Sequence, residues 1–283
     1  MSEMGIVGLM DVYDSLYPFP PNEKIKALRI VQVLPKSTFR HHQPQIGYGC
    51  ETSARTVLGT VPVEEDGSAH FYLPPGKEVF FQALDARGLA VQSMRSGTYV
   101  HAGEKLVCAG CHERKQRASP AALEERGVAF RRLPSEIRPE VEGSNPLSYP
   151  RLVQPVLDKH CVECHAKKAG KPKVIDLARG DWQKDRYHWY ASYRYLYPYA
   201  FHFGAKFHPG YDGWTSARTV PGKFGARASK LVELLDKGHY DVKLSPVEFR
   251  RITLWLDCNS DFFGAYEDTM AQSRGEIVKP LLE

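Results

Sequence analysis

Short apolar, β-branched runs alternate with turn sequences from Lys26 to about Val100. The turns contain Asp66-Gly67, Pro74–Gly76 and Asp85–Gly88, residues that favour tight reversals between strands. Because proline donates no ladder hydrogen bond, Pro62 predicts an edge strand or a break. This spacing predicts an antiparallel β-sandwich. The runs are residues 28–34, 57–63, 70–73, 79–84 and 89–94.

Helical periodicity replaces this pattern in the second half of the chain. Apolar residues share one face between Tyr149 and His160, where Pro155 predicts either a kink or the first turn of a helix. A second helix is predicted from Ser229 to Lys237, with Gly238 as its C′ residue. Ser245–Glu248 combines a capping box with proline at the first helical position, which predicts a third helix.

Composition narrows the class of protein. Hydrophobic residues make up 42% of the 283 residues and charged residues 25%, the balance of a folded chain. The sequence has no apolar run of the roughly 20 residues that a membrane span requires. The net charge of +5 comes from scattered basic residues without a basic stripe, so we expect neither a membrane span nor a nucleic-acid partner.

Two cysteine pairs carry the candidate chemistry. Cys108-Ala109-Gly110-Cys111-His112 and Cys161-Val162-Glu163-Cys164-His165 are both CxxCH sequences, which are typical of c-type haem attachment. The two thiols can form thioethers to one porphyrin, and the next residue supplies an imidazole to its iron. The alternative is a structural zinc site with four thiolates. We predict two covalently bound c-type haems, and the sequence makes no prediction of additional zinc or calcium.

The haem prediction has a consequence for the compartment. Haem c is attached outside the cytoplasmic membrane, so we expect a periplasmic or equivalent exported location. Met1–Leu16 has no basic n-region, so we expect the chain to be part of a longer exported precursor or to have lost its leader. Cys50 and Cys258 are left over; we expect two small buried residues, with a disulfide as the alternative.

The expected fold class is α+β. Residues 1–113 are predicted to be a β-rich, antiparallel sandwich-like domain that carries one haem. Residues 114–146 are rich in proline and charge and predict a linker, with a short helix at Ala121–Arg126. Residues 147–283 are predicted to be a mostly α-helical, cytochrome c-like domain.

Histidines supply the candidate iron ligands. His112 and His165 are the predicted proximal ligands. For the sixth position of the second haem we predict His239, with a solvated histidine at a helix end as the alternative. For the first haem the candidates are His41, His42, His70, His101 and Met94, of which His42 is taken forward because its loop can bend toward an iron. His160, His188, His202 and His208 are reserves.

Residues 182–214 hold thirteen of the chain's thirty-two aromatic residues. A wall around a haem is one interpretation of this cluster. Ordinary packing of an insertion is the interpretation we favour.

Five sequences in the first half of the chain match those of a known family in the same order: residues 61–71, 81–85, 93–96, 103–104 and 108–113. Their order resembles the middle domain of the hydrazine synthase alpha subunit and its planctomycete relatives. Residues 150–157 and 255–259 resemble the haem-bearing C-terminal domain of the same proteins.

The resemblance implies a haem protein, with one departure. In the hydrazine-forming enzyme, the catalytic haem takes a tyrosine just beyond the motif as its iron ligand, which frees the motif histidine to hold a metal. Here Glu113–Gln116 follow the motif, and the next tyrosine is Tyr149. We therefore expect His112 to bind iron directly.

Two functional hypotheses follow, and whether the protein is an enzyme stays open between them. The first is a di-haem electron-transfer module that serves a redox partner protein or further domains of the same polypeptide. The second is a haem-dependent oxidoreductase that acts on small nitrogen compounds, such as hydroxylamine, nitric oxide or ammonia, at the first haem. A zinc-binding interaction module is the non-redox alternative.

Overall fold

The computed structural model describes residues 3–40, 43–49, 52–111, 127–172, 174–202 and 219–282. The chain forms two compact units that interleave along the sequence. Unit 1 comprises residues 1–33, 57–140 and 217–224, and unit 2 comprises residues 34–56, 141–216 and 225–283. The division at residues 113 and 147 that the sequence suggested stays a prediction.

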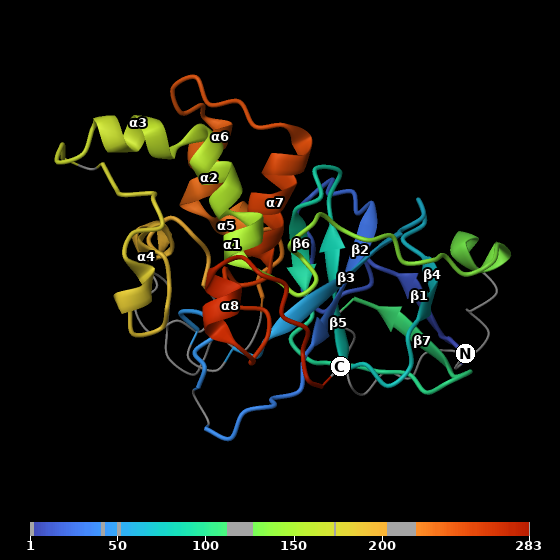
Figure 1. The fold of residues 1–283 in the computed structure, drawn as a ribbon. Helices are drawn as coiled ribbons and strands as arrows, with labels where there is room; N and C mark the ends of the chain where they lie inside the picture. Colours follow the sequence, from blue (N-terminus) through green and yellow to red (C-terminus); the bar gives the residue numbers. More distant parts are fainter. Residues whose placement is uncertain are drawn as a thin grey trace. The chain divides into compact units, whose positions relative to one another are not determined.

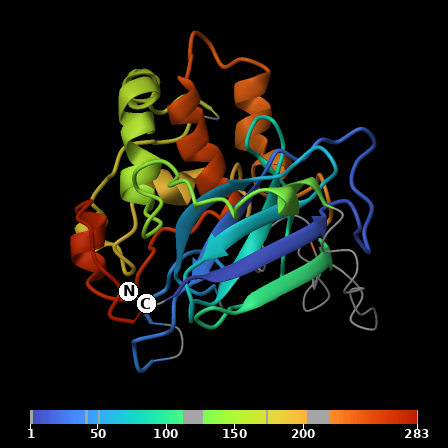
Figure 2. The ribbon, with the colours of Figure 1, turned by 90° about the vertical axis from the view of Figure 1, so that its right-hand side faces the viewer.

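A three-stranded sheet of unit 1 carries the first cysteine pair. Its strand order is β4-β1-β7, with β1 at Gly5–Asp11, β4 at Ala69–Leu73 and β7 at Lys105–Gly110 (Figure 1). β1 pairs antiparallel with β4 and parallel with β7, which lies beside it in Figure 2. β7 is therefore an edge strand of a mixed sheet.

A four-stranded sheet has the order β3-β2-β5-β6. Its strands are β3 at Arg55–Pro62, β2 at Ala27–Val33, β5 at Val79–Leu84 and β6 at Ala90–Ser93. β3 is at the edge and ends at Pro62, as that proline predicts. The Asp85–Gly88 turn joins the antiparallel pair β5 and β6, and the Asp66-Gly67 turn lies between β3 and β4.

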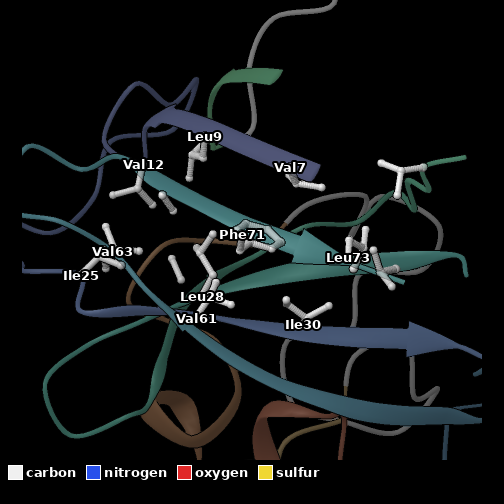
Figure 3. Close-up of a cluster of buried hydrophobic side chains, with 14 of the residues drawn as sticks. Val7, Leu9, Val12, Ile25, Leu28, Ile30, Val61, Val63, Phe71 and Leu73 are labelled. Carbon is white, nitrogen blue, oxygen red and sulfur yellow. The ribbon is translucent and has the colours of Figure 1, made fainter. Parts of the chain in front are cut away.

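The two sheets share one apolar core (Figure 3). Val7 and Phe71 come from the three-stranded sheet, and Leu28, Ile30 and Val61 come from the other. Each of these side chains is at most 2% exposed. The sandwich expected from the alternating runs is therefore formed by apolar faces packed against each other.

One charged group lies inside unit 1. The guanidinium of Arg29, on β2, is fully buried and donates from Nη1 to Oε1 of Gln82 at 2.8 Å. Its Nε atom lies 3.1 Å from Oε1 of Glu140, which is itself nearly buried. A buried cation requires such partners, because an uncompensated charge there is strongly destabilising.

The sequence prediction of an antiparallel sandwich is wrong for one pair of strands. β1 pairs parallel with β7, and neither strand was predicted from the pattern. Gly5 and Gly8 weaken the strand pattern of β1. Gly8 is nevertheless required, since a Cβ atom there would lie 2.5 Å from the Phe130 ring of the short 3-10 helix η2 (Val128–Arg131).

The described residues of unit 2 form short helices, loops and a longer helix, α7, at Pro246–Asp257. The capping box of α7 is present: Ser245 Oγ accepts from Glu248 N, and Glu248 Oε2 accepts from Ser245 N. Pro155 lies in the first turn of α2, as one of its two interpretations predicts. The other helices are α1 (Tyr149–Leu152), α2 (Gln154–His160), α3 (Val162–Lys167), η3 (Trp182–Lys184), α4 (Ala191–Leu196), α5 (Gly225–Ala228), α6 (Lys230–Asp236) and α8 (Thr269–Ser273).

Aromatic residues form the core of unit 2. Tyr193 of α4 is buried, with ring centroids 5.1 Å from Trp189 and 5.0 Å from Phe262. Tyr149 stacks on Phe262 and meets Trp255 of α7 edge to face. These described residues of the aromatic segment therefore serve packing, as the favoured interpretation holds, while residues 203–214 lie outside the described residues.

No described helix combines the length and the apolar character needed to cross a bilayer.

Candidate functional site

The first cysteine pair lies at the end of β7. Cys108 of β7 is paired with Leu9 of the neighbouring strand β1. Both cysteines, Cys108 and Cys111, pack against the apolar core of unit 1. Gly110, between them, lies against the backbone of Asp14, where a Cβ atom would be 1.8 Å from the Asp14 oxygen. Glycine at this position therefore lets the strand approach the β1 end closely and fixes where Cys111 emerges.

His112 lies outside the described residues, as do His41, His42 and His208. His70 is described and is nearly buried on β4, where it pairs with Gly8. Since Gly8 also pairs with Val107, the His70 side chain is on the face of the sheet opposite to Cys108. Burial lowers the pKa of His70, so its imidazole is neutral at pH 7.

The second cysteine pair lies at the junction of α2 and α3. Cys161 separates the two helices, and Cys164 and His165 follow on α3. The Nδ1 atom of His165 lies 2.8 Å from the backbone carbonyl oxygen of Ile175. A ring nitrogen that faces a carbonyl oxygen carries the proton, so Nε2 retains its lone pair for a metal.

His239 lies near His165. α6 ends at Asp236, and Gly238 adopts a φ of +85° just beyond it, as a C′ glycine does. The chain then turns back and brings the His239 ring to a centroid distance of 6.1 Å from the His165 ring. Burial, together with the nearby His165 and Lys168, lowers the pKa of His239, which favours the neutral, ligand-competent imidazole.

The ring separation provides a test of fit for a metal. Two imidazoles that bind one metal from opposite sides, each at about 2 Å, have centroids about 6 to 6.5 Å apart. The observed 6.1 Å matches this value. The distance between the two rings therefore permits both to reach one iron, next to two thiols at the spacing that haem attachment requires.

The thiols are not poised as nucleophiles. Burial raises the pKa of the Cys111 thiol to about 12 and that of the Cys161 thiol to about 11. A reactive redox pair lowers its thiol pKa to form a thiolate. The described residues also contain no group of three or more histidine, cysteine or acidic side chains arranged to hold a metal.

The reserve histidines make other contacts. His160 pairs with Glu248 at 3.0 Å, and His188 lies 3.4 Å from Thr269 Oγ1. His202 stacks on Tyr197 in the aromatic core of unit 2. The exposed His101 ring contacts the Tyr99 ring, and Met94, which follows β6, is half-buried.

The two remaining cysteines are only partly described. Cys258 is buried at the C-terminal end of α7. Cys50, its partner in the alternative disulfide prediction, lies outside the described residues.

Two features of the second site escaped the sequence prediction. One is the Ile175 carbonyl that faces His165. The other is the contact of Lys168 with Tyr240, where Nζ lies 3.8 Å from the ring centroid. A backbone carbonyl leaves no pattern in the sequence, so the Ile175 contact could not be predicted. Lys168, three residues after the candidate ligand His165, and Tyr240, directly after His239, could have been noticed in the sequence.

Comparisons with known proteins agree with the resemblance found in the sequence. The family model for the hydrazine synthase alpha subunit middle domain matches residues 23–113. This chain is therefore similar to the alpha subunit of hydrazine synthase, and that prediction is confirmed. None of the curated proteins that were compared matches the chain.

A solved structure extends the similarity to most of the chain. The hydrazine synthase of Kuenenia stuttgartiensis matches with a TM-score of 0.57 at 18% sequence identity. The match covers 93% of this chain and 43% of that chain, so this chain spans less than half of that protein's length. At this identity the likeness shows a shared α+β fold.

Proposed function

We propose that the protein is a di-haem c-type cytochrome that transfers electrons, with one covalent haem at each CxxCH sequence. Cys108, Cys111 and His112 would hold the first haem, and Cys161, Cys164 and His165 the second. Bound haem supplies a one-electron iron couple. The similarity to hydrazine synthase alpha supports a haem-associated role for this chain.

The proximity of the His165 and His239 rings, 6.1 Å apart, is the observation that carries this proposal. An iron with two strong ligands exchanges electrons, whereas an open position is needed to bind a substrate. The Ile175 carbonyl orients His165 and fixes its tautomer, and α6 with Gly238 positions His239. Both imidazoles would hold an iron that changes oxidation state without changing ligands.

The first site supports a second candidate function. Small nitrogen compounds would react there if its sixth position is open, and the similarity to hydrazine synthase favours this alternative. His42 remains the proposed sixth ligand of the first haem. If His42 binds that iron, no position is open to a substrate, and both haems would be electron carriers.

We also propose an exported, periplasm-like location, because covalent haem attachment takes place there. A redox partner protein, or further domains of the same polypeptide, would receive the electrons. These proposals follow from the haem chemistry.

The deciding experiment measures haem content and spin state in protein that was exported with a haem-attachment system. Mass spectrometry and a pyridine haemochrome assay should give two covalent haems per chain. Resonance Raman spectra should then show six-coordinate low-spin iron at both. One high-spin haem that binds nitric oxide or hydroxylamine would favour the catalytic alternative, and the absence of covalent haem would overturn both.

A further inference from the structure

Two short segments of this chain contain more basic than acidic residues. Residues 159–173 and 237–243 contain seven lysines and two acidic residues, Glu163 and Asp241. Removing these from the totals of 38 basic and 33 acidic residues leaves 31 of each. The whole net charge of +5 therefore corresponds to the excess within these two segments.

The structure brings the two segments together within unit 2. One segment contains His165 and the other His239, whose ring centroids are 6.1 Å apart. Lys168 and Tyr240 connect the same segments, with Nζ 3.8 Å from the ring centroid. Because the two segments are far apart in the sequence, only folding brings them together.

Five of the six described lysines in these segments are exposed, and two of the five have no acidic partner among the described residues. We define the lysine surface as the described lysines Lys159, Lys167, Lys168, Lys171, Lys237 and Lys243; all are exposed except Lys168, which is half-buried. Within the described part of the chain, Lys159, Lys167 and Lys237 each pair with one glutamate. No described acidic group pairs with Lys171 or Lys243.

An exposed tyrosine, Tyr240, lies next to the candidate iron ligand His239 on this surface. Tyr240 is 75% exposed, and its ring lies 4.9 Å from that of His239, the residue before it. The candidate iron ligand is thus adjacent to solvent rather than enclosed in the core. A short path from the surface is what electron exchange between two proteins requires.

We propose that the lysine surface docks an acidic one-electron carrier protein, which exchanges electrons with the haem held by His165 and His239. This inference rests on the proposed function. Charge complementarity accelerates such an encounter about 10- to 1000-fold at low salt, and screening removes the effect. The lysines would therefore act on the association rate more than on the site itself.

The test uses the full chain with both haems and flavodoxin hydroquinone, an acidic one-electron donor, as the probe. Stopped-flow absorbance measures the rate of haem reduction at ionic strengths of about 20 and 300 mM. The test variant is Lys171→Glu with Lys243→Glu, which leaves the Lys168 contact with Tyr240 intact. The matched control is Lys24→Glu with Lys279→Glu, two exposed lysines outside both segments that change the net charge equally.

The expected result is reduction about tenfold slower in the test variant at low ionic strength, a change below about twofold in the control, and convergence at high ionic strength. Equal slowing of both variants would overturn the inference, because net charge alone would then explain the rates. So would an unchanged rate in the test variant. Haem content and spin state are measured first: a two-haem protein whose rate ignores these lysines rejects the docking surface alone, whereas missing haem rejects the proposed function.

Discussion

The Nδ1 atom of His165 lies 2.8 Å from the carbonyl oxygen of Ile175, in the loop that follows α3. This contact fixes the ring orientation and leaves Nε2 as the nitrogen with a lone pair. The ring of His239 lies near that of His165, at a centroid distance of 6.1 Å. A helix and a helix-terminating turn thus supply one imidazole each.

Replacing His239 with alanine should open one coordination position. We expect one of the two haems to change from six-coordinate low-spin to high-spin iron, and added imidazole to restore the low-spin spectrum. Resonance Raman and electron paramagnetic resonance spectra measure this change. His160→Gln is the control, because it alters a neighbouring histidine that pairs with Glu248. Low-spin iron at both haems in His239→Ala would remove His239 from the ligand set.

Gly110→Ala should affect the first cysteine pair selectively. A methyl group there would lie 1.8 Å from the Asp14 oxygen, so β7 must shift and Cys111 must move with it. We expect haem content to fall from about two to about one per chain. Mass spectrometry of the attached haem measures this. Glu163→Ala, at an exposed position inside the second motif, should retain both haems; equal loading of Gly110→Ala would show that the strand end adapts.

Much of the local structure was predictable, because its causes are local. The capping box at Ser245, the C′ role of Gly238 and the edge position set by Pro62 each depend on a few adjacent residues. β1 escaped prediction because Gly8 weakens its pattern, although the distant Phe130 ring requires that glycine. Likewise, the sequence predicts His239 as a ligand, but only the fold shows that its ring lies 6.1 Å from that of His165.

Arg29→Ala should destabilise unit 1 strongly. The substitution leaves the nearly buried carboxylate of Glu140 and the amide of Gln82 without their cationic partner. Breaking a buried ion pair costs about 3–5 kcal/mol of unfolding free energy. Urea unfolding followed by circular dichroism measures the loss. The partly exposed pair Arg132–Glu64 is the comparison, and Arg132→Ala should cost about 1 kcal/mol or less. Equal losses in the two variants would contradict the role of burial.

Asp261 should make the stability of unit 2 depend on pH. Its carboxyl is fully buried, neither oxygen accepts a hydrogen bond from a described residue, and Arg55 Nε lies 3.4 Å from Oδ2. Burial raises the pKa of Asp261 from 3.8 to about 7, and Arg55 only partly opposes this. The sign follows from proton binding: between pH 4 and pH 7 the unfolded chain has lost this proton while the folded chain retains it. Stability should therefore fall as pH rises through this window and level off above it, with a slope from this group of at most about 1.4 kcal/mol per pH unit.

Asp261→Asn isolates this contribution, because the amide is neutral at every pH. We expect the variant to lose the part of the slope between pH 4 and pH 7 that Asp261 supplies, and to gain stability relative to the parent as pH rises from 5 to 8. Urea unfolding followed by tryptophan fluorescence at pH 5 and pH 8 measures both effects. Asp241→Asn, at an exposed site in the same unit, should leave the slope unchanged. If the parent and Asp261→Asn lose stability in parallel across this window, the carboxyl is ionised in the folded protein, and the ion pair with Arg55 outweighs its desolvation.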